Sequence, residues 1–283
     1  MNHDAVVERV LAWASTTIRD LPWRTTRDPW GVLVSEVMSQ QTQVGRVAEK
    51  WPIFMERFPT PSACAESSLG EVLQLWQGMG YPRRARNLPQ SAERIVELGE
   101  FPRDLDSLLA MPGIGPYTAR AVLAFAFGED VGVLDTNVGR VLARVDGVSL
   151  SVSDAQELAD SLVPEGESWL WNQALMDLGG TVCTSRIAHC EVCPLNDVCA
   201  WRGDPAVADP ATASAGVSRP QARFEGSDRQ ARGRLLKQLG QGGVYVDDVP
   251  DIVGREFHVA RKVVAGLVSD GLCVVEGNLI RLP

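Results

Sequence analysis

Four cysteines crowd into one short stretch of this 283-residue chain, and their spacing constrains the fold more than any other feature. They are separated by six, two and five residues, in the order Cys183, Cys190, Cys193 and Cys199. Four thiolates this close in sequence can enclose one metal centre. The start of the chain lacks the basic and apolar regions of an export signal, so a metal site is favoured over disulfides. Structural zinc sites commonly pair two separate Cys-x2-Cys motifs, which this stretch does not have.

Composition predicts an ordinary globular protein without membrane spans. The chain is 45% hydrophobic and 22% charged, and it contains no long apolar run of membrane-spanning length. We therefore expect a cytoplasmic protein. The net charge of −9 runs against nucleic-acid binding. However, residues 221–283 hold nine basic and eight acidic side chains, so the acidic excess lies in the earlier part of the chain.

The sequence divides into a long helical part, a linker and a small C-terminal part. We expect short helices with brief connections over residues 4–200, because no stretch there shows the alternation of apolar and polar residues that is typical of a strand. Residues 203–222 are rich in Pro, Ala, Gly and Ser, which is typical of a linker. Helix starts are indicated at Asp28-Pro29, Thr60-Pro61 and Ser151-Val-Ser153-Asp154.

The C-terminal part predicts three helices followed by a hairpin. The expected helices cover residues 228–239, 247–253 and 256–269, and Glu276-Gly277-Asn278 is a hairpin turn between two short apolar runs. This order is that of a winged-helix domain, in which the third helix faces DNA. The alternative is a small packing domain whose charges are only solvated. The predicted fold class is thus all-α, followed by a small α+β winged-helix-like domain.

Residues 108–122 predict a helix, a Gly-x-Gly turn and a second helix. Gly113 and Gly115 would let backbone amides approach an anion, and Pro116 suits the first turn of the second helix. Such a hairpin can hold a DNA phosphate without reading the sequence. A helix end followed by a new helix would look similar.

Two acidic residues stand out further along the chain. Asp135 lies between an apolar stretch and a new helix, where its default role is that of an N-cap. Glu36 shares a polar helical stripe with Ser39, Gln40 and Gln43 within an otherwise apolar segment. Taken alone, that stripe indicates a side facing solvent.

Together these motifs resemble MutY-type adenine glycosylases of the endonuclease III, or helix–hairpin–helix–GPD, superfamily. The resemblance covers residues 11 to about 202 and includes Leu21-Pro22-Trp23-Arg24, Ser35-Glu36-Val37-Met38, Trp171-Asn172-Gln173, the Gly-x-Gly hairpin and the cysteine stretch. It implies a helix–hairpin–helix glycosylase fold with a [4Fe–4S] cluster on the four cysteines. It also implies a base-excision enzyme, associated with the bacterial nucleoid, that acts as a monomer on double-stranded DNA.

The resemblance assigns the catalytic roles. Asp135 would stabilise the positive charge that builds on the sugar as the base leaves, with Asn137 and Tyr117 completing the catalytic set. Glu36, in an apolar pocket that raises its pKa, would protonate adenine at N7. Gln41 would fill the gap left by the extruded nucleotide, and Tyr81 would read the opposite base. Contacts to substrate or DNA are assigned to Trp23, Arg24, Trp30, Gln41, Tyr81, Arg83, Arg84, Arg86, Gly113 and Gly115. The two tryptophans are equally consistent with plain core positions.

Strand cleavage is not expected. Bifunctional members of the superfamily carry a lysine just after the Gly-x-Gly turn to form a Schiff base. Tyr117 occupies that place, and no lysine occurs between Lys50 and Lys237. An arginine cannot substitute because its guanidinium stays protonated.

By analogy with the family, we predict four parts. These are a six-helix domain at 22–134, a cluster domain from 1–21 plus 135–202, the linker at 203–222 and the winged-helix-like domain at 223–283. We do not expect the family's usual Nudix-like domain, which recognises 8-oxoguanine, in this chain. Ser39, Pro82 and Gly139 also depart from the family pattern.

Adenine opposite 8-oxoguanine or guanine is the expected substrate. One alternative is removal of thymine or uracil from mismatches, which Tyr117 and Asp135 would also fit. Glu36 favours adenine, because release of a pyrimidine depends less on this protonation. Another alternative is a non-enzymatic iron–sulfur regulator that binds DNA, which would not need Glu36, Tyr117 and Asp135 together.

Overall fold

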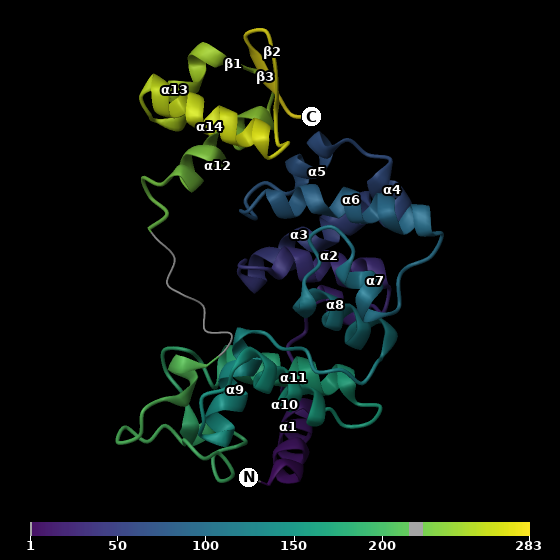
Figure 1. The fold of residues 1–283 in the computed structure, drawn as a ribbon, viewed down its shortest axis with the longest axis vertical. Helices are drawn as coiled ribbons and strands as arrows, with labels where there is room; N and C mark the ends of the chain where they lie inside the picture. Colours follow the sequence, from purple (N-terminus) through teal and green to yellow (C-terminus); the bar gives the residue numbers. More distant parts are fainter. Residues whose placement is uncertain (1, 215–222) are drawn as a thin grey trace. The chain divides into compact units, whose positions relative to one another are not determined.

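The computed structural model describes residues 2–214 and 223–283, and helices form most of the regular structure (Figure 1). The chain divides into two compact units, each assembled from segments that are separate in the sequence. The first unit comprises Met1–Val32, Arg103–Leu109 and Ile114–Pro220, and the second comprises Leu33–Pro102, Ala110–Gly113 and Gln221–Pro283. The predicted domains follow other boundaries and stay a prediction.

The first unit holds α1 (His3–Thr17), α7 (Leu105–Leu109), α8 (Pro116–Val122), α9 (Thr136–Asp146), α10 (Val152–Ser161) and α11 (Ser168–Thr181). The second holds α3 (Val44–Arg57), α4 (Pro61–Ala65), α5 (Leu69–Leu75) and α6 (Arg83–Leu98). Helix α2 (Pro29–Ser39) begins in the first unit and ends in the second. Shorter turns of helix lie at Pro22–Thr25, Leu123–Phe127, Cys190–Val192, Pro210–Ala213 and Val246–Asp248. The long helical part that the sequence predicts is confirmed.

The core of the first unit lies between α1, α9, α10 and α11. Val6 and Val10, one turn apart on α1, are fully buried, as is Trp171 on α11. This is the apolar stripe of an amphipathic helix facing its neighbours. Leu195, which lies within the cysteine stretch, is 1% exposed and belongs to the same cluster. The cysteine stretch is therefore anchored in this core.

Polar caps begin several helices where the sequence predicts them. Thr60 Oγ1 accepts a hydrogen bond from the backbone N–H of Ala63 at 3.2 Å, and Ser151 Oγ accepts one from Asp154 at 3.2 Å. Pro61 follows Thr60 at a position where a missing N–H costs nothing. Losing one such cap typically destabilises by about 1 kcal/mol.

An aromatic cluster forms part of the core of the second unit. The rings of Phe54 and Phe58 on and after α3 are 5.0 Å apart, and Phe54 meets Trp76 at 6.5 Å, both edge to face. Such pairs add to the free energy gained from burial alone. Trp76 also donates its indole N–H to the carbonyl of Gly80 at 2.9 Å. The cluster thus supports the loop that follows it.

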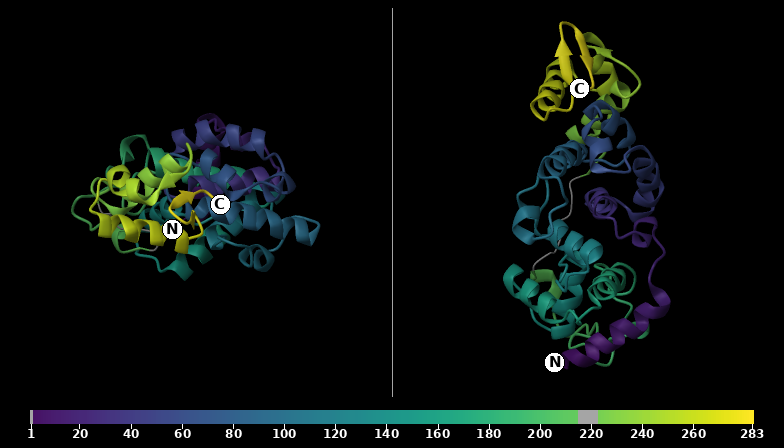
Figure 2. Two further views of the ribbon diagram at one scale, coloured as in Figure 1. Left: turned by 90° about the horizontal axis from the view of Figure 1, so that it is seen from above. Right: turned by 90° about the vertical axis from the view of Figure 1, so that its right-hand side faces the viewer.

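The C-terminal segment consists of α12 (Asp228–Leu239), α13 (Val249–Val253), α14 (Phe257–Ser269) and strands β1 (Val244–Tyr245), β2 (Val274–Glu276) and β3 (Leu279–Arg281). The predicted helices and hairpin are confirmed. A third strand, β1, was not predicted and pairs antiparallel with β3, giving the order β1-β3-β2. Figure 2 shows that the sheet is confined to this segment. The winged-helix assignment itself stays a prediction.

The described half of the predicted linker is attached to the first unit. Asp209 forms an ion pair with Arg144 at 2.7 Å, and Ala211 is 3% exposed. Residues 215–222 of that linker lie outside the described residues. Within residues 2–214 and 223–283, no helix is long and apolar enough to cross a membrane.

Candidate functional site

Asp135 caps α9, and its carboxylate is held by three donors. Oδ1 accepts from the backbone N–H of Asn137 at 2.8 Å and of Val138 at 2.7 Å, and Oδ2 accepts from Nδ2 of Asn137 at 2.7 Å. Burial raises the pKa of Asp135, while these bonds and the charge of Arg140 oppose the rise. Asp135 therefore acts as the N-cap of α9, and the same hydrogen bonds fix the orientation of its carboxylate.

Asn137 is itself fixed between α9 and α11. Arg140 donates to its Oδ1 at 2.8 Å and to the carbonyl oxygens of Gly179 at 2.7 Å and Cys183 at 2.8 Å. A Cβ on Gly179 would lie 2.7 Å from the Cβ of Asn137, so only glycine permits this approach. A chain of hydrogen bonds thus runs from Asp135 to the first cysteine of the cysteine stretch.

Asn172 holds the segment that leads into Asp135. Its Oδ1 accepts from the N–H of Val133 at 2.8 Å, and its Nδ2 donates to the carbonyls of Val131 at 3.0 Å and Ser168 at 2.8 Å. The residue is 1% exposed. A buried amide with all these partners fixes the backbone, and removing it would leave buried groups unpaired.

The motif Trp171-Asn172-Gln173 did not indicate a role for Asn172, and the sequence did not single out Arg140 or Asp177. For Asn172 and Asp177, the available signal was a polar side chain within the apolar helix α11.

Glu36 lies on α2 and is only 5% exposed. Its neighbours Val34 and Met38 are fully buried, so α2 is enclosed around much of its surface. The interpretation of this polar stripe as a solvent-facing side is therefore wrong at Glu36. The stripe faces solvent only near the end of the segment, where Gln43 is exposed. Glu36 and Asp135 belong to different compact units.

The segment before α2 is buried in the first unit. Trp23 and Trp30 are 8% and 1% exposed. Arg24, predicted to contact DNA, forms a two-pronged pair with the buried carboxylate of Asp177, at 2.7 and 2.9 Å. Arg19 donates to the same carboxylate at 2.8 Å through Nε. Arg24 therefore secures this segment to α11.

Tyr81 lies in a strained loop. It adopts a φ of +46° next to Gly80 at +72°, and the left-handed region is costly for an aromatic residue. Arg84 supports the loop by donating to the carbonyls of Met79 at 3.1 Å and Met38 at 3.0 Å. Its guanidinium lies 5.5 Å from the centre of the Tyr81 ring, and burial lowers its pKa to about 10. Arg84, which is also predicted to contact DNA, is thus hydrogen-bonded to backbone carbonyls of the protein itself.

Gln41, the predicted wedge, lies in the turn after α2. It is exposed and has a φ of +53°. A non-glycine residue in this conformation is uncommon, and such strain clusters at functional positions.

Arg83 and Arg86 meet the C-terminal segment. Arg83 forms an ion pair with the carboxylate of Asp270, and Arg86 donates to the Asp270 carbonyl at 2.5 Å. The guanidinium of Arg83 holds the pKa of Asp270 below its usual range, against a smaller effect of burial. Arg83 remains 69% exposed, so its outer face stays open to water.

The structural requirement for glycine differs between the two glycines of the hairpin that joins α7 and α8. Gly113 has a φ of +75°, and a Cβ there would clash with the side chain of Asn87. Gly115 caps α8 with an ordinary φ of −101°, and a Cβ there would meet no atom within 4 Å. The fold requires glycine at position 113, whereas position 115 is open to an approaching group. Tyr117 follows on α8 and is half-buried.

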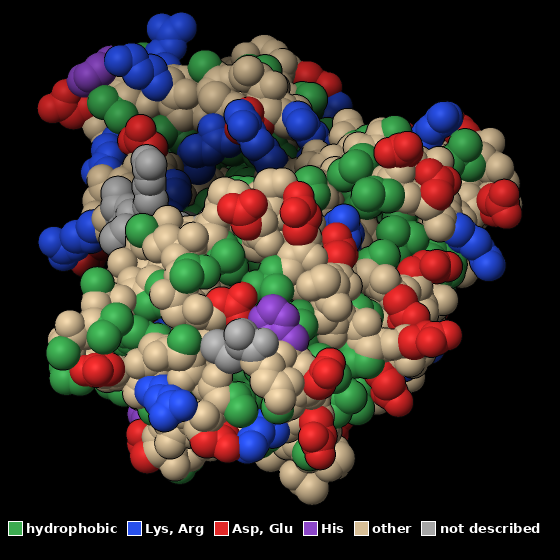
Figure 3. All heavy atoms as spheres, turned by 60° about the horizontal axis from the view of Figure 1, so that its bottom comes forward, with side chains coloured by type: hydrophobic (Ala, Val, Ile, Leu, Met, Phe, Trp, Pro, Cys, Tyr) green, Lys and Arg blue, Asp and Glu red, His purple; other side chains and the backbone are tan. Residues whose placement is uncertain are grey.

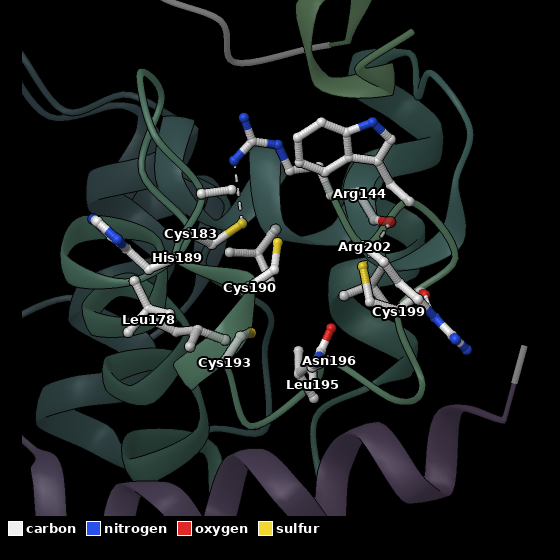
Figure 4. A pocket seen from close by; sticks show the side chains of 15 residues that line it. Arg144, Leu178, Cys183, His189, Cys190, Cys193, Leu195, Asn196, Cys199 and Arg202 are labelled. Carbon is white, nitrogen blue, oxygen red and sulfur yellow. Dashed lines mark hydrogen bonds between the residues drawn. The ribbon is translucent and has the colours of Figure 1, made fainter. Parts of the chain in front are cut away.

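The four cysteines line one cavity (Figure 4). Cys183 follows α11, and Cys190 opens the short helix Cys190–Val192. Cys183 Sγ accepts from Arg144 at 3.3 Å, and Cys199 Sγ donates to the Arg144 carbonyl at 3.2 Å. A Cβ on Gly203 would lie 3.0 Å from Cys190 Sγ.

Four cysteine side chains that line one cavity have the donor chemistry of an iron–sulfur site. In the described part of the chain, no three His, Cys, Asp or Glu side chains are arranged to hold one metal ion. An iron–sulfur cluster is held by four cysteine thiolates that are spread around a larger body than one ion. The N–H donor from Arg144 also suits a charged sulfur.

Charge is unevenly distributed on the surface. In the face drawn in Figure 3, Asp and Glu side chains are spread over much of the area, whereas Lys and Arg side chains are most crowded near the top. The net charge of −9 is thus compatible with a local basic surface.

Comparisons with known proteins identify the family of this chain. Residues 34–165 match the model of the HhH-GPD superfamily of base excision DNA repair proteins. An adenine DNA glycosylase of Mycolicibacterium smegmatis is 45% identical over 276 residues, covering 93% of this chain and 90% of that protein. Because only 7% of this chain lies outside that match, it includes most of the C-terminal segment.

Solved structures support the fold. A thermostable thymine-DNA glycosylase matches with a TM-score of 0.66 and 29% identity, covering 71% of this chain and 96% of that one. Endonuclease III in a non-covalent complex with DNA matches with a TM-score of 0.63 and 25% identity, covering 72% and 97%. The predicted helical glycosylase fold is thereby confirmed. With this identity and coverage, the chain belongs to the MutY-type adenine DNA glycosylase family of the HhH-GPD superfamily.

Proposed function

We propose that this chain is a monofunctional glycosylase that removes adenine mispaired with 8-oxoguanine or guanine in double-stranded DNA. The observation that carries the proposal is the 45% identity, over 93% of the chain, with a protein named adenine DNA glycosylase. The buried carboxyl of Glu36 in the Ser35-Glu36-Val37-Met38 motif supports adenine as the base.

Asp135 acts on the sugar. Cleavage of the bond between base and sugar leaves positive charge on the sugar ring, which an ionised carboxylate stabilises. Two backbone N–H groups and the side chain of Asn137 hold the carboxylate of Asp135 in advance, so little reorganisation is needed as the charge develops. The same donors favour the ionised form against the effect of burial.

Glu36 acts on the base. Adenine is a poor leaving group as an anion and a better one once N7 carries a proton. A buried carboxyl group holds a proton more readily than an exposed one, and Glu36 is 5% exposed. Proton donation of this kind typically contributes about 10²–10⁴-fold in rate.

The reaction ends at base removal. A strand-cleaving glycosylase needs an amine that attacks the sugar, and Tyr117 stands where the bifunctional family members carry lysine. The phenol of Tyr117 cannot form a Schiff base. Water adds to C1′ of the sugar and completes the hydrolysis, so the product is an intact strand with an abasic sugar.

Cys183, Cys190, Cys193 and Cys199 would hold a [4Fe–4S] cluster in the cavity they line. When bound, the cluster would supply a rigid cross-link between the end of α11 and the segment that follows it. Arg144 donates to Cys183 Sγ from the protein side, and Arg140 ties the same segment to Asn137.

The C-terminal segment acts as a winged-helix-like DNA-binding module. Its helix α14 carries His258, Arg261 and Lys262, and the β2–β3 hairpin forms the wing. The whole chain acts as a monomer in this proposal.

An alkali-cleavage assay tests the proposed activity. The full-length protein is incubated with a labelled duplex that contains adenine opposite 8-oxoguanine. We expect strand cleavage at that adenine only after alkali treatment. Cleavage without alkali would contradict the monofunctional assignment, and no cleavage at all would contradict the proposed activity.

The same assay tests the alternative activity, which is release of thymine or uracil. This alternative is suggested by the structural match to a thymine-DNA glycosylase at 29% identity. The higher identity with an adenine DNA glycosylase favours adenine. Alkali-labile sites at a thymine or uracil opposite guanine, and none at adenine, would favour the alternative.

A further inference from the structure

Within the second unit, the C-terminal segment is attached to helix α6 through a buried carboxylate. Asp270 ends α14, is 7% exposed, and binds the guanidinium groups of Arg83 on α6 and Arg232 on α12. Arg86 donates to the Asp270 backbone carbonyl at 2.5 Å. Three arginines from two segments thus meet at one residue, which fixes α12 and α14 against the start of α6.

Close packing at a second point supports the same attachment. The backbone N–H of Gly70 on α5 donates to the carbonyl oxygen of Pro283 at 3.1 Å. A Cβ on Gly70 would lie 2.8 Å from that oxygen, so glycine is required for the contact. The C-terminal segment therefore rests on two separate features of this unit, at α5 and at α6.

The attachment places an arginine of the C-terminal segment at Tyr81. Arg229 on α12 donates through NH1 to the hydroxyl of Tyr81 at 3.3 Å. Arg84 lies 5.5 Å from the centre of the same ring. Tyr81 is thus approached by two guanidinium groups, one at its ring and one at its hydroxyl, while its backbone is held in the left-handed region.

We propose that Arg229 is a specificity-determining residue that, beside Tyr81, recognises the purine opposite the adenine. This inference rests on the proposed function. 8-Oxoguanine differs from guanine by a carbonyl oxygen at C8 and a proton at N7. A guanidinium is a pure donor that matches carbonyl oxygens. Arg229 would donate to the C8 oxygen, which guanine lacks.

The surroundings of Arg229 agree with a recognising role for this arginine. Arg229 is half-buried, and the ring of Phe224 lies 5.9 Å from its guanidinium. A partly desolvated guanidinium next to a phenol discriminates between acceptors better than a fully hydrated one.

The test compares two duplexes with the full-length protein, one with adenine opposite 8-oxoguanine and one with adenine opposite guanine. Dissociation constants and single-turnover rates are measured for the unmodified chain, for Arg229→Ala and for Arg223→Ala. The control removes the same charge from the same segment at an exposed position. The ratio of values for the two duplexes is compared within each variant, so partial misfolding of a variant does not alter it.

We expect Arg229→Ala to lower the preference for 8-oxoguanine by roughly 5- to 100-fold, with guanine duplexes changed by less than about twofold. Arg223→Ala should leave the preference unchanged. Equal weakening on both duplexes would assign Arg229 to phosphate binding and overturn the inference, as would an unchanged preference. If the unmodified chain released adenine from neither duplex, the proposed function itself would fail, which is a different result.

Discussion

The buried carboxylate of Asp177 should be one of the largest single contributors to the stability of the first unit. Asp177 is 1% exposed and accepts hydrogen bonds from Arg19 and Arg24. Asp177→Asn keeps the volume but removes the charge. Arg19 is 35% exposed and can regain water, whereas Arg24 is 6% exposed and cannot. Breaking a buried pair from one side costs about 3–5 kcal/mol, and the partial exposure of Arg19 places the expected loss near ~3 kcal/mol.

The assay is urea unfolding, followed by circular dichroism, with Asp197→Asn as the matched control. Asp197 pairs with Arg9 at 2.6 Å, but its side chain is 61% exposed, so that loss should be at most ~1 kcal/mol. Burial opposes the ionisation of Asp177, yet hydrogen bonds from Arg24 and Arg19 outweigh it and hold its pKa below the ordinary value.

The direction of this pKa shift fixes the expected pH dependence. Because the folded pKa of Asp177 is depressed, its contribution is complete above the unfolded pKa of about 3.9. It is lost as the pH falls through the folded value. The difference between wild type and Asp177→Asn should thus be constant near neutrality and shrink below about pH 4. If Asp177→Asn lost no more stability than Asp197→Asn at neutral pH, the reasoning would be refuted.

Three further predictions concern the site. Gly113→Ala should destabilise by about 1–3 kcal/mol because of its positive φ and its contact with Asn87, whereas Gly115→Ala should leave the melting temperature unchanged and weaken duplex binding in fluorescence anisotropy. Asp135→Asn should abolish turnover with duplex affinity retained, and the wild-type rate should fall in acid with a midpoint above about pH 3.9, since the pKa of Asp135 is raised. Cys199→Ser should remove the brown colour of the purified protein, and a variant with full iron content would refute the ligand assignment.

Local chemistry explains what the sequence predicted well. A threonine or serine before a helix, as at Thr60 and Ser151, satisfies donors only a few residues away, so its role is visible in the sequence. The same holds for Asp135, whose cap involves the next three residues. The two-residue strand β1 has too few residues for any periodicity, and its partner Ile280 is distant in sequence.

Long-range pairing explains what the sequence did not reveal. Arg83 and Arg84 are neighbours of the same type, yet Arg83 reaches Asp270 and Arg84 is buried against carbonyl groups of a loop. Arg24 is predicted to contact DNA, and no sequence pattern indicates its partner Asp177, which lies 153 positions away. The partners of a buried charge depend on the tertiary fold, which no local pattern encodes.

The proposed acid catalysis by Glu36 can be tested most directly with a substrate that cannot accept the proton. A duplex with 7-deazaadenine opposite 8-oxoguanine carries carbon in place of N7 and keeps the hydrogen-bonding edge of adenine. The account predicts tight binding and no release of this base, and a loss of about 10²–10⁴-fold in adenine release for Glu36→Gln. Release of 7-deazaadenine at a rate close to that of adenine would contradict it.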